Sequence, residues 1–185
     1  AQEFCTRSRA GFGCCVAAVD GILIWVERPN MSECRKAKCG PRKFFCGRKH
    51  KHGLNCQAVA DARGRFLDMT IQFPGSASDV LSFKASALYG KLRAGLLAPD
   101  LCLFGDNAYL NTSFMATPYS NTSSGSKDAY NFYHSQLRIR VECAFGMFVH
   151  RWGILRRAFS HFISLSKITS MVTCLGKLHN FCIDE

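Results

Sequence analysis

Residues 101 to 110 read LCLFGDNAYL, and this stretch is the best starting point for the fold. Four mostly apolar residues run into Gly105 and Asp106, as in a buried strand whose end presents a carboxylate at the edge of a sheet. Asp and Asn are also common in turns, because their side chains hydrogen-bond the local backbone. The stretch alone therefore leaves Asp106 as either a turn residue or a ligand, and only partners elsewhere in the chain can decide.

Three stretches upstream predict further strands. Residues 16 to 26, VAAVDGILIWV, form an apolar and largely β-branched run broken only by Asp20 and Gly21, which predicts a central strand carrying one acid. Residues 54–60 (LNCQAVA) and 66–73 (FLDMTIQF) predict two strands joined as a hairpin by the turn DARGR. A charged residue within a buried run needs a reason, so Asp20 joins Asp106 as a candidate functional acid.

Helices are expected after the hairpin and at the end of the chain. Ser78 and Asp79 can cap a helix reaching Leu88 or Lys91. We expect its inner side to carry Val80, Leu81 and either Ala87 or Leu88. Residues 118–128 are polar and turn-rich and predict a loop, and a final amphipathic helix is expected over 165–181. Its inward residues should be Ile168, Met171, Val172, Leu175 and Leu178.

The strongest periodic signal begins at Gln136. Apolar residues recur there at steps of three and four, which predicts a helix whose stripe packs into the core: Leu137, Val141, Phe145, Phe148, Trp152 and Leu155. Glu142 follows Val141 at about 100° round the helix, on the shoulder of the buried face, and Arg138 lies one turn before it. Glu142 is therefore the third candidate acid.

Composition indicates a folded, basic domain. The 185 residues are 48% hydrophobic and show no internal repeat, as expected for one domain with a sizeable core. Lys and Arg number 24 against 13 Asp and Glu, and the resulting net charge of +11 suits a polyanionic partner such as nucleic acid. From Cys34 to His52 there is no acid, and the run is either a solvated loop or a phosphate-binding patch, with these basic residues: Arg35, Lys36, Lys38, Arg42, Lys43, Arg48, Lys49 and Lys51.

The eleven cysteines are better explained as reduced thiols than as a disulfide framework, because no secretory signal pattern opens the chain. The group Cys34, Cys39, Cys46, His50 and His52 matches the spacing of structural zinc sites poorly. No uncharged apolar run approaches the length of a membrane span. The sequence opens at AQEFC without an initiator Met, so we expect a piece of a longer protein.

The predicted order of strands and helices is that of an α/β fold, which can gather separate carboxylates at one edge of a sheet. Asp20, Asp106 and Glu142 are the candidates, with 35 residues between the last two. Hard divalent cations prefer oxygen ligands, and a pair of Mg²⁺ or Mn²⁺ ions can activate water and steady the leaving oxygen of a phosphodiester. The sequence thus favours metal-dependent phosphodiester chemistry.

Five segments in order resemble the catalytic domain of the PIF/Harbinger-type DDE transposases and their domesticated nuclease-like relatives. They are VDG at 19–21, LNCQAVADARGRFLDMTIQFPGSASD at 54–79, GDNAYL at 105–110, N-x2-HS-x2-R-x2-VE-x-AFG at 131–146 and LHNF at 178–181. The resemblance implies an RNase H-like fold with a mixed central sheet flanked by helices. It places the catalytic domain at residues 16–183, leaves 1–15 as an N-terminal remnant, and implies that the family's N-terminal DNA-recognition region is absent.

The resemblance also implies roles for individual residues. Asp20, Asp106 and Glu142 would form the catalytic acidic triad, and Asp79 would be a further metal-associated acid unless it only caps its helix. The cofactor would be Mg²⁺ or Mn²⁺ in a two-ion site. The implied partners are DNA and, in complete transposases, a Myb-like DNA-binding protein, with a homo-oligomer as a further expectation, no membrane partner, and the nucleus as location.

Other matching positions have simpler structural interpretations. Arg138 can steer the Glu142 carboxylate, Asn131 can cap a loop, and His179 with Asn180 fits a packed, hydrogen-bonded pair in the last helix better than a catalytic one.

The chain also departs from the family pattern at two places. Ile22 and Leu23 follow Gly21 where members usually have Thr and His, and Val149 or His150 replaces a common Lys. Two functions therefore stay open: a metal-dependent DNA endonuclease or transposase, with strand transfer in a complete enzyme, and a domesticated or decayed module that binds DNA or protein without cleavage.

Overall fold

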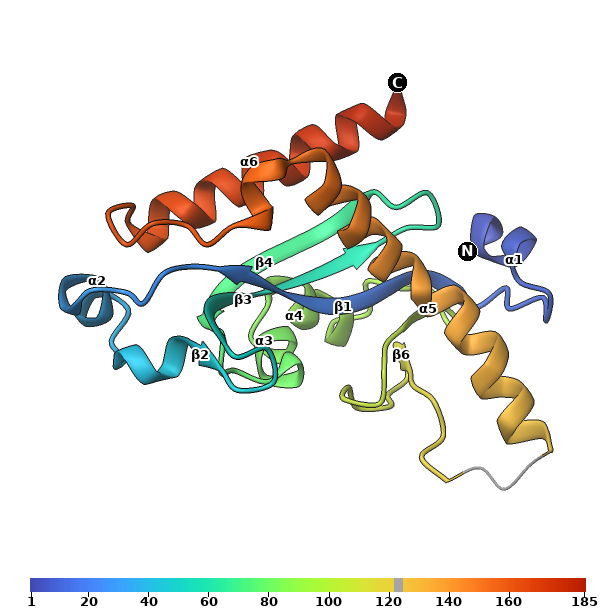
Figure 1. Cartoon of the computed structure of the whole chain (residues 1–185). Helices are drawn as coiled ribbons and strands as arrows, with labels where there is room; N and C mark the ends of the chain where they lie inside the picture. Colours follow the sequence, from blue (N-terminus) through green and yellow to red (C-terminus); the bar gives the residue numbers. More distant parts are fainter. Residues whose placement is uncertain (122–124) are drawn as a thin grey trace.

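A computed structural model describes residues 1–121 and 125–185 of the chain and has a mixed sheet at its centre (Figure 1). The strands are β1 (Cys15–Trp25), β2 (Phe45–Cys46), β3 (Lys51–Ala60), β4 (Phe66–Pro74), β5 (Cys102–Phe104) and β6 (Met115–Ala116). β3 pairs antiparallel with β1 and β4, whereas β5 pairs parallel with β1 and β6. β2 pairs with the first residues of β3. The predicted hairpin and mixed sheet are confirmed, and the arrangement agrees with an RNase H-like fold.

Helices lie on both sides of this sheet. They are α1 (Gln2–Arg7), α2 (Met31–Lys36), η1 (Pro41–Phe44), α3 (Asp79–Lys84), α4 (Ala87–Arg93), α5 (Ser126–Arg151), η2 (Gly153–Arg156) and α6 (Leu165–Asp184). In Figure 1 the long α5 crosses β1, and α6 runs beside β4. The first residues also join the fold, since Phe4 of α1 is buried against Cys15, Phe104 and Leu137.

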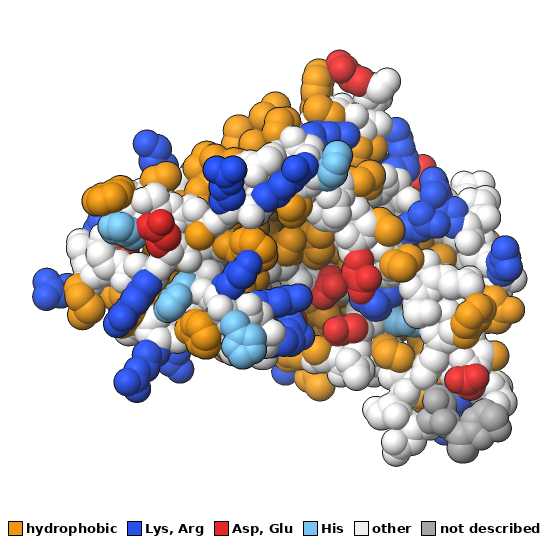
Figure 2. All heavy atoms as spheres, in the orientation of Figure 1, with side chains coloured by type: hydrophobic (Ala, Val, Ile, Leu, Met, Phe, Trp, Pro, Cys, Tyr) orange, Lys and Arg blue, Asp and Glu red, His pale blue; other side chains and the backbone are white. Residues whose placement is uncertain are grey.

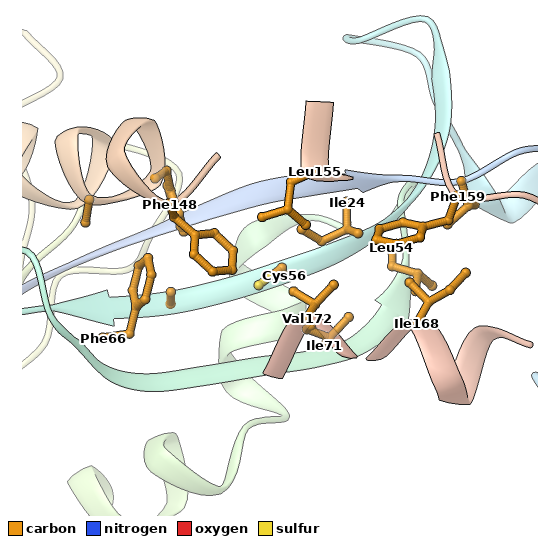
Figure 3. Close-up of a cluster of buried hydrophobic side chains, with 14 of the residues drawn as sticks. Ile24, Leu54, Cys56, Phe66, Ile71, Phe148, Leu155, Phe159, Ile168 and Val172 are labelled. Carbon is orange, nitrogen blue, oxygen red and sulfur yellow. The ribbon is translucent and has the colours of Figure 1, made fainter. Parts of the chain in front are cut away.

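β1 is buried on both faces, which explains its nearly continuous apolar sequence. Its residues alternate between two cores because successive side chains of a strand point to opposite faces. Ala18 and Ile24 belong to the core under α5 and α6, whose side chains Figure 3 shows, whereas Ala17 and Val19 belong to the core on the α3 and α4 side. Two layers of packing thus fix the position of β1 and of the acid that it carries.

The single helix predicted after the hairpin is wrong in its length and its inner face. It is two helices, because the chain restarts at Ser86, whose hydroxyl accepts the N–H of Tyr89 and caps α4. The restart changes which residues face the core: Phe83 is buried, whereas Leu81 is 53% exposed. Periodicity read across a break between helices assigns the wrong face.

The two long helices are confirmed, with corrections at their ends. α5 begins at Ser126, so the last residues of the loop predicted over 118–128 are helical, and residues 122–124 of that loop lie outside the described residues. The apolar stripe does not reveal the first turns of α5, because their first buried residue is the polar His134. That ring stacks on Phe104 and its Nε2 lies 3.1 Å from the carbonyl oxygen of Ala116. In α6, Leu178 is 44% exposed and His179 takes the inward position instead.

The η2 segment completes the packing after α5. Trp152 ends α5 and packs against the main core, as predicted. Leu155 of η2 is buried there too.

Candidate active site

Strand register brings Asp20 and Asp106 together. Ala18 of β1 pairs with Phe104 of the parallel strand β5. Asp20 follows Ala18 by two residues, and Asp106 follows Phe104 by two residues. β5 ends at Phe104, so beyond this pair β1 has an open edge on that side.

Asp20 is mostly buried, with its side chain 19% exposed. Burial raises the pKa of its carboxyl from 3.8 to about 6, and the charges of Asp106 and Asp79 act in the same direction. The N–H of Gly21, which donates to Asp20 Oδ1 at 2.7 Å, and the cation of Arg138 oppose that shift. Three aspartates therefore share one electrostatic environment, although they come from three separate segments.

Glu142 joins Asp20 through Arg138. Both residues lie on α5 one turn apart, and Arg138 Nη1 is 2.5 Å from Glu142 Oε1 and 3.8 Å from Asp20 Oδ2. The guanidinium group thus bridges the carboxylate of α5 to that of β1. In Figure 2 acidic side chains gather at the centre of the drawn face, where α5 approaches β1 in Figure 1.

Asp79 is held by β3 and does not cap its helix. Ser78 is the N-cap of α3, and its hydroxyl accepts the N–H of Leu81. Asp79 Oδ1 instead accepts hydrogen bonds from Asn55 Nδ2 at 3.0 Å and Gln57 Nε2 at 2.8 Å. The carboxylate lies directly over Gly21, where a Cβ would collide with it. The expectation that Asp79 caps the helix is wrong, and its carboxylate belongs to the acidic group.

A buried tyrosine completes the support of Asp79. The Tyr109 hydroxyl donates to Gln57 Oε1 at 2.6 Å, so Gln57 links the tyrosine to the aspartate. Burial, with the charges of Asp79, Asp20 and Asp106, raises the pKa of Tyr109 and keeps it protonated. Sequence reasoning missed this network. Its signal was the pair Asn55 and Gln57, two amides on one face of the otherwise apolar strand β3.

Asp106 is both a turn former and a member of the acidic group. Its Oδ1 accepts the N–H of Ala108 at 2.9 Å, as in an Asx turn. The N–H of Gly105 donates to the carbonyl of Ala116, which fixes the exit of β5. The turn orients the carboxylate toward β1.

Comparison with known proteins agrees with this geometry. The family described as DDE superfamily endonuclease matches residues 19–180, a span that contains all four acids. The chain belongs to this family. It is 25% identical over 179 residues to the human protein named "Putative nuclease HARBI1", covering 95% of this chain and 48% of that protein. It is also 25% identical over 188 residues to "Protein ALP1-like" of Arabidopsis thaliana, covering 95% and 44%.

The chain spans about half the length of the curated relatives that it matches. No solved structure matches it. Among the described residues, no helix is long and apolar enough to cross a membrane.

The other residues matched to the DDE family have structural partners, as predicted. Asn131 clamps the backbone of Tyr119, accepting its N–H and donating to its carbonyl. Asn180 does the same to Phe66 of β4, at 2.7 and 2.8 Å. His179 is fully buried between Arg151 Nη1 and the carbonyl of Gly64, and burial lowers its pKa. These side chains hold separate segments of the fold together.

The residues of the basic run lie in different surroundings. Arg48 and Lys49, on the β2–β3 turn, line a cavity of about 410 Å³ beside Asp79, and Arg48 Nη2 is 3.8 Å from Asp79 Oδ2. Lys51 lies over the Trp25 ring and Lys36 pairs with Glu33. The others lie on or beside α2 and η1: Arg35, Lys38, Arg42 and Lys43. Figure 2 shows Lys and Arg side chains on the same face as the acids.

The donor set fits a hard divalent cation by its chemistry, since it consists of carboxylate oxygens on fixed supports. Within residues 1–121 and 125–185, no three His, Cys, Asp or Glu side chains converge closely enough to hold an ion as they stand. The Arg138 cation pairs with both Asp20 and Glu142, and a divalent cation held by the same carboxylates would likewise neutralise their charge. The zinc alternative has no such support: the Cys34 thiol is buried and donates to Pro29, and the His52 ring packs on Phe45.

Proposed function

We propose that this chain is a divalent-metal-dependent DNA endonuclease domain, with strand transfer in the complete transposase. The observation that carries the proposal is the position of Asp20 and Asp106 just beyond the paired ends of β1 and β5, with Asp79 over Gly21 and Glu142 joined to Asp20 through Arg138. Family membership supports a nuclease, because the matching family is one of endonucleases.

Asp20, Asp106 and Glu142 would hold Mg²⁺ or Mn²⁺, with Asp79 as a fourth acid. When bound, such ions activate water and stabilise the leaving oxygen of a phosphodiester. Other residues of the chain orient these carboxylates. Gly21 N–H fixes one oxygen of Asp20, Arg138 holds Glu142 toward β1, and the Tyr109–Gln57 pair holds Asp79. Above a pH of about 6 Asp20 is ionised and available as a ligand.

The substrate in this proposal is DNA, with its backbone on the basic run. Side chains that contact phosphates release counterions, so affinity should fall steeply with salt and depend little on sequence. A nuclear location follows from that substrate. Target recognition would come from a separate region or a Myb-like partner protein, and self-association as a homo-oligomer belongs to the same proposal.

Plasmid nicking with Mg²⁺ or Mn²⁺ tests the proposal. Asp106→Asn keeps an oxygen that can accept the Ala108 N–H, so the turn should survive while the anionic ligand is lost. We expect nicking to fall at least a hundredfold. Asp100→Asn is the matched control, since Asp100 is exposed and outside the acidic group, and its nicking should equal wild type. Equal nicking by wild type and Asp106→Asn would refute the role of Asp106.

A second candidate function is a DNA-binding or protein-binding module without cleavage. The observation that favours it is the placement of Ile22 and Leu23, which line the cavity beside Asp79 with apolar groups where the family usually has polar ones. Absence of nicking in both wild type and Asp106→Asn, with salt-sensitive DNA binding retained by both, would select this function.

A further inference from the structure

A cavity of about 410 Å³ adjoins the acidic group on the other face of β1. Asp20 points toward Arg138 and α5, and successive side chains of a strand alternate, so Gly21 faces the opposite way, under Asp79. The cavity begins there and extends between the β2–β3 turn and the segment Gly75–Asp79. Its volume falls within the range of pockets that hold small organic ligands, roughly 300–1,000 Å³.

One wall of the cavity is apolar and rigid. The Leu23 side chain lies against Gly53 and Gly75, where a Cβ on either glycine would collide with it. Ile22 borders the cavity too, but its side chain alternates with that of Leu23 and packs against the main core on the other face of β1. An apolar side chain such as Leu23 suits the face of a nucleobase better than a phosphate.

The rim of the cavity is cationic and polar. Arg48 and Lys49 lie on the β2–β3 turn at its mouth, and Asn55, Ser76 and Ser78 add groups that can hydrogen-bond. The Arg48 side chain is 74% exposed, and its only anionic partner among the described residues is Asp79 at 3.8 Å. An exposed pair of this length contributes little stability, so the guanidinium group is free to bind another anion.

We propose that this cavity is a single-nucleotide subsite of the DNA strand that is cut. The phosphate would lie on Arg48 and Lys49, and the base would pack on Leu23, one nucleotide away from the bond at the acidic group. The inference rests on the proposed function for its ligand. In this proposal Arg48 and Lys49 bind a single strand that separates from the duplex, whereas the basic residues on α2 and η1 contact duplex phosphates.

Binding of a short single strand tests the subsite without cleavage. The probe is a pentanucleotide with 2-aminopurine at its centre, titrated by fluorescence in EDTA. R48A/K49A should weaken binding at least tenfold. Ser76→Trp keeps every charge and places an indole in the cavity from an exposed position, and it should weaken binding as much. Circular dichroism of each variant checks that the fold is retained.

R42A/K43A is the matched control, because it removes two adjacent basic residues of the same run that do not line the cavity. It should weaken pentanucleotide binding less than twofold, and it should weaken binding of a 30-base-pair duplex more than R48A/K49A does. The subsite would be overturned if Ser76→Trp bound the pentanucleotide with wild-type affinity, or if R48A/K49A and R42A/K43A lost equal pentanucleotide affinity.

Asp106→Asn should bind the pentanucleotide like wild type. Loss of nicking and loss of strand binding are therefore separate results, and failure of one proposal is distinguishable from failure of the other.

Discussion

The buried carboxylate of Asp20 should make the stability of this chain fall as pH rises, and Asp20→Asn should remove that effect. Burial raises the pKa of Asp20 from 3.8 to about 6 in the folded chain. Between these values the folded state binds more protons than the unfolded state, so the free energy of unfolding decreases with pH. The loss is complete about one pH unit above the folded-state pKa of about 6.

The difference between the two pKa values corresponds to about 3 kcal/mol, at about 1.4 kcal/mol per pKa unit. Asn carries no charge and can still accept the Gly21 N–H that Asp20 Oδ1 accepts. Asp20→Asn should therefore be more stable than wild type by about 3 kcal/mol at pH 7.5, and by less than about 1 kcal/mol at pH 4. For a chain of this size the gain at pH 7.5 is about 6–12 °C in Tm.

Urea unfolding in EDTA at pH 7.5 and pH 4.0 measures both values. Asp100→Asn is the control, since Asp100 is exposed and has a positive φ of 67°, which Asn accepts readily. An equal stability difference between Asp20→Asn and wild type at the two pH values would refute the reasoning. Mg²⁺ added at pH 7.5 should stabilise wild type more than Asp20→Asn, because a ligand that binds only the folded state raises its stability.

Three further substitutions test the packing of the fold and the position of Asp79. Asn180→Ala should cost about 2 kcal/mol in urea unfolding, because it leaves the N–H and the carbonyl of Phe66 without their partner. Phe148→Ala should cost about 3–5 kcal/mol in the same assay, because the ring is fully buried in the main core. Gly21→Ala should cost about 1–3 kcal/mol by collision with Asp79, and should lower plasmid nicking more than tenfold.

The controls for these substitutions come from the same elements. Leu178→Ala, on the exposed side of α6, should cost less than about 1 kcal/mol. Asn180→Ala and Phe148→Ala should retain nicking per folded molecule, since neither residue contacts the acids. Wild-type nicking by Gly21→Ala would show that the position of Asp79 over β1 is unimportant for the reaction.

The strands β1, β3, β4 and β5 were predictable because their burial leaves a local pattern, whereas β2 and β6 are two residues long and leave none. β1 is nearly continuously apolar because both its faces are buried. The turn DARGR between two strand-like runs predicts the hairpin. The central part of α5 was predictable for the same reason, since Val141, Phe145 and Phe148 recur on one face. The start of α5 was not, because His134 is polar and becomes a core residue only through Phe104 and the Ala116 carbonyl.

The type and order of the central elements and the candidacy of Asp20, Asp106 and Glu142 could be read from the sequence, because hydrophobic period and motif spacing are properties of the chain alone. How the acids are held became clear only from the folded chain. Asp79 is bound by Gln57 and Tyr109 from distant segments, and Arg138 joins Asp20 to Glu142 across β1 and α5. Hydrogen bonds and ion pairs between distant segments depend on strand register and helix packing, which leave no local periodicity in the sequence.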